Sequence, residues 1–95
     1  MTLEALRTQL AKITSDLTSS GFGNVKPETT KKLKKYSDVA GKLGLKEGKH
    51  LIDNLIEIIK AINAGKSKAE SGNLRLIALN FYLLNLPNSE LIEDL

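Results

Sequence analysis

Apolar residues recur every three or four positions along most of the chain, and this spacing constrains the fold more than any other feature. In the first segment the steps are 3, 4, 3 and 4 along the row Leu3, Leu6, Leu10, Ile13 and Leu17. Because an α-helix has about 3.6 residues per turn, this row predicts a helix with one apolar face. No segment sustains the alternation of apolar and polar residues that is typical of a β-strand. The sequence therefore predicts an all-α protein.

Glycines and polar residues divide the chain into four predicted helices. Residues 19–24 include two glycines and end the first helix, and Pro27 suits the first position of the second. Gly44 is expected to adopt the left-handed conformation that ends the second helix, and Gly65 lies in the break after the third. The predicted helices cover about residues 3–18, 27–43 and 69–86, and the third begins between residues 46 and 49 and ends at 63.

The length of the chain limits it to one simple architecture. Its 95 residues are expected to form a single helical domain, residues 1–95, around one core. Short breaks place successive helices side by side, so we predict a compact antiparallel bundle of four helices. Pro87 is expected to end the fourth helix, and a short C-terminal helical turn is predicted beyond it, in which Leu91, Ile92 and Leu95 fold back.

Residues that carry enzyme chemistry are almost absent. The chain has no Cys and a single His, His50, so thiolate and multi-histidine metal sites are excluded. Gly65-Lys66-Ser67 resembles the end of a phosphate-binding loop, but the first glycine of that motif is missing and no strand precedes it. Asp53 and Glu57 lie at i and i+4 and are expected to face water. We predict a protein that is not an enzyme, with no catalytic, cofactor-binding or metal-binding residues and no evident small-molecule substrate.

The sequence has no feature of a targeting or membrane-spanning segment. Its amino terminus lacks the basic start and the uninterrupted apolar run of a signal peptide. The longest nearly apolar stretch, residues 74–86, contains Arg75, Asn80 and Asn85 and is too short to span a bilayer. We therefore expect no membrane partner and predict a cytoplasmic location.

Positive charge is concentrated in the second helix and the residues after it. Residues 26–49 contain eight lysines and three acidic residues, a local net charge of +5, whereas the whole chain carries +3. Leu33, Tyr36, Ala40 and Leu43 are expected to face inward, which turns the lysines outward. The candidate interaction residues on this outer side are Lys31, Lys32, Lys34 and Lys35. Such a face is either simply solvated or attracts an acidic partner, anionic lipid or, weakly, nucleic acid.

The predicted fourth helix is apolar on two sides. One side has Leu74, Ile77, Ala78, Phe81 and Leu84, and the other has Leu76, Leu79, Leu83 and Leu86. A helix that is apolar nearly all round is normally central or covered by a partner, and a bundle this small cannot surround every helix. We predict that a strip containing Leu76, Leu79 and Leu83 stays exposed and mediates homodimerisation or docking on a protein partner. Full burial within the monomer is the alternative.

The joint between the second and third helices matches the spacing of many helix-turn-helix proteins. Ala40 is followed four residues later by Gly44 and then by Leu45, and a lysine-rich helix precedes them. The third helix, however, offers Asp53 and Glu57 where a recognition helix needs basic side chains. A non-enzymatic accessory or protein-interaction module is therefore the favoured function. A small nucleic-acid-binding protein of helix-turn-helix type is the alternative.

The order of the apolar motifs resembles a known helical family. The motifs are Gly21-Phe22, Ala40-x-x-Leu43-Gly44-Leu45, Leu51-x-x-x-Leu55-x-x-x-Ile59 and Leu74-x-x-x-Ala78-x-x-Phe81-Tyr82-Leu83. Over about residues 6–86 they are similar to the helical region that accompanies the SWIM zinc finger in some bacterial proteins. The zinc motif of that family needs Cys-x-Cys followed by Cys-x-His, and this chain has no Cys. The resemblance therefore implies a helical accessory module, with no zinc or nucleic-acid role for any residue.

Overall fold

Four α-helices form most of residues 1–86, the part of the chain that the computed structural model describes. They are α1 (Leu3–Ser20), α2 (Pro27–Lys42), α3 (Lys46–Asn63) and α4 (Ala69–Leu84). The all-α fold and the four predicted helices are confirmed, although α1 ends two residues later, α2 one residue earlier and α4 two residues earlier than expected. The predicted C-terminal turn, with Leu91, Ile92 and Leu95, lies outside the described residues.

Local signals in the sequence account for the helix ends. The side chain of Thr2 accepts a hydrogen bond from the backbone N–H of Ala5 at 3.1 Å, which caps the start of α1. Gly44 has a φ of +79°, and the N–H of Leu45 beyond it donates to the carbonyl of Ala40 at 2.9 Å. This hydrogen bond and the left-handed glycine are those of a Schellman motif. The predicted left-handed stop at Gly44 is therefore confirmed.

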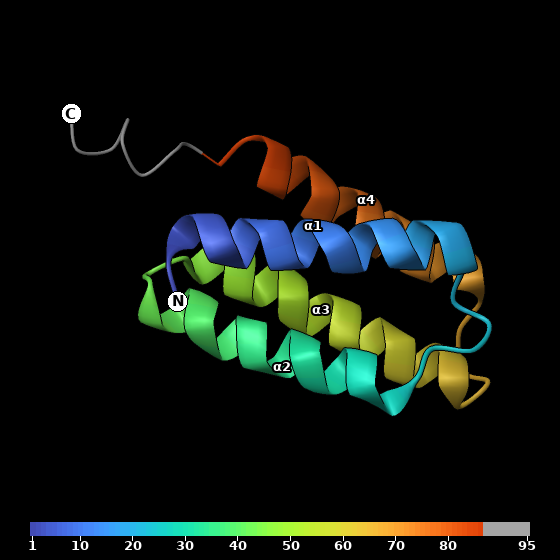
Figure 1. Cartoon of the computed structure of the whole chain (residues 1–95). Helices are drawn as coiled ribbons and strands as arrows, with labels where there is room; N and C mark the ends of the chain where they lie inside the picture. The colour runs from blue at the N-terminus through green and yellow to red at the C-terminus, as the bar shows by residue number, and fades with distance from the viewer. Residues whose placement is uncertain (87–95) are drawn as a thin grey trace.

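Each helix packs antiparallel against the next, and α4 returns to pack against α1 (Figure 1). Near the start of α1, Arg7 donates to the backbone carbonyl of Leu86, just beyond α4. At the opposite end of the α1–α4 pair of helices, Gly72 in α4 lies against Phe22, which follows α1. The order around the bundle is therefore α1, α2, α3 and α4, with α2 and α4 diagonally opposite.

The core takes apolar residues from every helix. The buried apolar side chains are Leu6, Leu10, Ile13, Leu17, Phe22, Leu33, Tyr36, Ala40, Ile52, Leu55, Ile56, Ile59, Leu76, Leu79 and Leu83. The inward positions predicted for Leu33, Tyr36 and Ala40 are confirmed. The inward position predicted for Leu43 is wrong, because this residue is the C-cap of α2, where the chain leaves the helix, and 41% of it is exposed.

Two glycines in helices let neighbouring side chains approach the backbone closely. A Cβ added at Gly72 would lie 2.9 Å from the ring of Phe22 and 3.0 Å from Cδ1 of Ile62. A Cβ added at Gly48 would lie 2.9 Å from Cε2 of Tyr82. These distances are shorter than a carbon–carbon contact allows, so any other residue would displace its neighbours. Gly72 in particular places one side of α4 against Phe22 and α3.

Candidate functional site

The most distinctive surface of the described chain is an apolar row on the outside of α4. Its four large side chains are mostly exposed: Leu74 (69%), Ile77 (64%), Phe81 (68%) and Leu84 (77%). Steps of 3, 4 and 3 residues place them in one line along the helix, which we call the outer strip. Single exposed apolar residues are common, but a continuous line of four marks a candidate binding surface.

An exposed strip was expected on α4, but the residues chosen for it are wrong. Leu76, Leu79 and Leu83 are only 5%, 0% and 4% exposed and belong to the core. The helix has an apolar row on each of two sides, and α1 and α3 cover only one of them. Spacing alone predicts both rows without deciding which of them faces inward.

A small residue decides which row is buried. The buried row, here called the inner row, consists of Gly72, Leu76, Leu79 and Leu83. Since the ring of Phe22 and the side chain of Ile62 occupy the space beside Gly72, α4 approaches its neighbours closely on this side. A glycine inside a helix costs about 1 kcal/mol relative to alanine, so its presence signals a packing requirement. Gly72 is therefore the one residue by which the inner row could have been recognised in the sequence.

Hollows flank the outer strip on both sides. On the side of α1, a groove of about 500 Å³ is lined by Thr18, Asn73, Leu76, Ile77 and Asn80. On the side of α3, a groove of about 370 Å³ is lined by Glu47, Leu51, Ala78, Phe81, Tyr82 and Asn85. The strip is thus a ridge of large side chains between two hollows, a shape that suits packing against another helix.

Charge is sparse on the helix that carries the outer strip. Between residues 71 and 86, Arg75 alone is charged. The polar residues there include Asn73, Asn80 and Asn85, which are exposed and uncharged. The strip itself therefore neither repels a charged partner nor offers a charge for a partner to match.

Tyr82 lies at the border between the outer strip and α3. Burial raises the pKa of its hydroxyl, and the negative charge of Glu47 raises this pKa further, while a hydrogen bond with the backbone of Gly48 lowers it. The net rise favours the neutral phenol. This border of the strip therefore stays uncharged at Tyr82 throughout the neutral pH range.

The lysines predicted as interaction residues lie on a separate surface. Lys31, Lys32, Lys34 and Lys35 are all exposed on α2, which is diagonally opposite α4 (Figure 1). Lys34 pairs with Asp38 at 3.7 Å, and both side chains are mostly exposed. Exposed pairs of this kind contribute little to stability. The structure therefore brings none of these lysines to the apolar strip.

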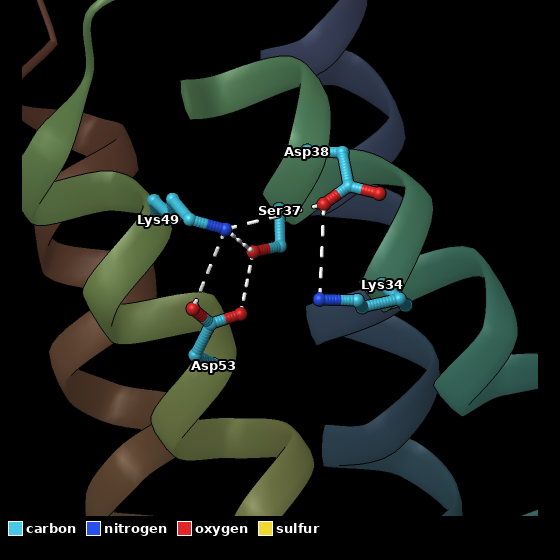
Figure 2. A network of polar contacts seen from close by, with 5 residues as sticks. All are labelled: Lys34, Ser37, Asp38, Lys49 and Asp53. Carbon is cyan, nitrogen blue, oxygen red and sulfur yellow. Dashed lines mark hydrogen bonds and ion pairs between the residues drawn. The ribbon is translucent and has the colours of Figure 1, made fainter. Parts of the chain in front are cut away.

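A polar network joins α2 to α3 (Figure 2). Nζ of Lys49 donates to Oγ of Ser37 at 3.1 Å, and Ser37 donates in turn to Oδ1 of Asp53. Lys49 also pairs with Asp53 at 3.6 Å and with Asp38 at 4.0 Å. Asp53 was expected to face water only. It pairs with Lys49 one turn earlier on α3, and the antiparallel packing of α2 adds Ser37 as a second partner.

The chemistry of this network is structural. A serine beside a lysine acts as a nucleophile when the lysine accepts the serine proton. Here the ammonium group of Lys49 lies between two carboxylates, and an ammonium has no lone pair with which to accept a proton. Ser37 is also fully buried, out of reach of a substrate. The network therefore fixes the position of α2 along α3.

The packing of α2 on α3 differs from that of a helix-turn-helix motif. In that motif the two helices cross at about 90–120°. Here α2 and α3 lie side by side and antiparallel (Figure 1), and the side chain of Lys49 lies against both Ser37 and Gly41. The joint at Gly44 is therefore the turn of a helical hairpin, and α3 does not project as a recognition helix does.

Neither the described residues nor the comparisons with known proteins assign a metal site, a membrane-spanning helix or a family. Among residues 1–86, no three His, Cys, Asp or Glu side chains are grouped so that they could hold a metal ion. No helix within the same range combines the length and the apolar character needed to cross a bilayer. Comparison of the chain with protein-family models, curated proteins and solved structures finds no match in any of the three. The resemblance to the SWIM-associated helical region stays a prediction.

Proposed function

We propose that this chain is a non-enzymatic helical module that binds another protein through the outer strip of α4. The observation that carries the proposal is the continuous line of exposed apolar side chains at Leu74, Ile77, Phe81 and Leu84. The inner row of the same helix packs in the core, so the strip is held in a fixed geometry before any partner binds. Preformed surfaces of this kind lose little conformational entropy on binding.

The exposed apolar area supports binding of modest strength. Each of the four side chains is 64–77% exposed. Full burial of a large apolar side chain stabilises by about 1.5–3 kcal/mol, so covering what remains exposed would contribute about 1–2 kcal/mol per residue. Association costs about 4–15 kcal/mol in lost translational and rotational freedom. The gain from covering the four side chains is therefore comparable with the cost of association, so a partner must add an apolar surface of its own. We expect dissociation constants in the micromolar range.

Nucleic-acid binding through α2 and α3 has weaker support. The exposed lysines of α2 suit weak, salt-dependent contact with phosphates. The antiparallel α2–α3 hairpin, however, presents no helix to a groove, and the exposed Glu57 on α3 repels phosphate. Phe22 and Tyr36 are buried in the core, so they offer no ring for a base to stack on. These features favour the protein-interaction module.

Site-specific photo-cross-linking in cells that express the full chain tests the proposal. A photoreactive phenylalanine analogue replaces Phe81, and a matched control carries the same analogue at Lys31 on α2. We expect a defined cross-linked protein, identified by mass spectrometry, from position 81 only. Adding Ile77→Gln should abolish that product. Equal yields from both positions, or a product insensitive to Ile77→Gln, would contradict the proposal.

A further inference from the structure

We draw no further inference here: the strongest candidate, the outer strip of α4 with the grooves on either side of it, belongs to the surface already described, and nothing in residues 1–86 shows what covers it.

Discussion

The two apolar faces of α4 have nearly the same composition, but one is buried and the other is exposed. The inner row (Gly72, Leu76, Leu79 and Leu83) is buried, whereas the outer strip (Leu74, Ile77, Phe81 and Leu84) is mostly exposed. Their apolar character does not separate them. One glycine distinguishes them, since the inner row has at Gly72 a position small enough to accept Phe22 and Ile62. The comparison teaches that shape, and not hydrophobicity, decides which apolar face joins the core and which is left for a partner.

The largest effect should come from truncating matched residues on the two faces. Leu79→Ala removes a fully buried side chain and leaves a cavity, so the free energy of unfolding should fall by about 2–5 kcal/mol. Ile77→Ala on the outer strip should change it by less than about 0.5 kcal/mol. Urea unfolding at low protein concentration, where self-association does not contribute, measures both values. Similar losses in the two variants would remove the distinction between the faces.

A smaller but more specific effect is expected at the glycine of the inner row. Gly72→Ala should lower the free energy of unfolding by about 1–3 kcal/mol, because the new methyl group meets Phe22 and Ile62. In an open helix the same change would stabilise by up to about 1 kcal/mol, so the sign of the effect is diagnostic. Gly23→Ala, in the turn between α1 and α2, is a control for the glycine-to-alanine change without a clash, since no atom other than those of its chain neighbours lies within 4 Å of its added Cβ. A stabilised Gly72→Ala variant would show that another feature orients α4.

The smallest effect concerns Tyr82, at the border between the two faces. Its pKa is raised in the folded chain, first by burial and then by Glu47, so the folded state holds the phenol proton more tightly than the unfolded state. The resulting stabilisation is fully present below pH 10, about the ordinary tyrosine pKa, and is lost as the pH rises through the folded-state value.

Thermal unfolding at increasing alkaline pH measures this contribution. The wild type should lose stability more steeply above pH 10 than Tyr82→Phe does, because the variant lacks the titrating group. Identical alkaline profiles for the two chains would mean that Tyr82 is equally solvated in the folded and unfolded states.

Sequence reasoning predicted the inward face of α2 better than that of α4. In α2, the outward lysines leave one apolar side, so Leu33, Tyr36 and Ala40 had to face inward. Leu43 continues the same spacing but lies where the helix ends, so the periodicity no longer applies to it. Stop signals such as Gly44 and Gly65 act locally, which is why the helix boundaries were predictable.

The remaining errors concern contacts between helices. In α4 both rows satisfy the helical spacing, and the choice of face depends on Phe22, a residue far away in the sequence. One partner of Asp53 likewise depends on the antiparallel packing that places Ser37 beside it. The four exposed residues of the outer strip were visible as a row, but only tertiary packing made them the free surface.

The central claim is that the outer strip of α4 is the binding surface and that the lysine face of α2 is not. Backbone amide spectra of the wild-type chain, recorded alone and with the protein captured by cross-linking at position 81, test it directly, residue by residue. We expect shifts confined to the neighbourhood of residues 73–85, with Lys31–Lys35 unchanged. Shifts centred on Lys31–Lys35, or no shifts when that protein is added, would contradict the claim.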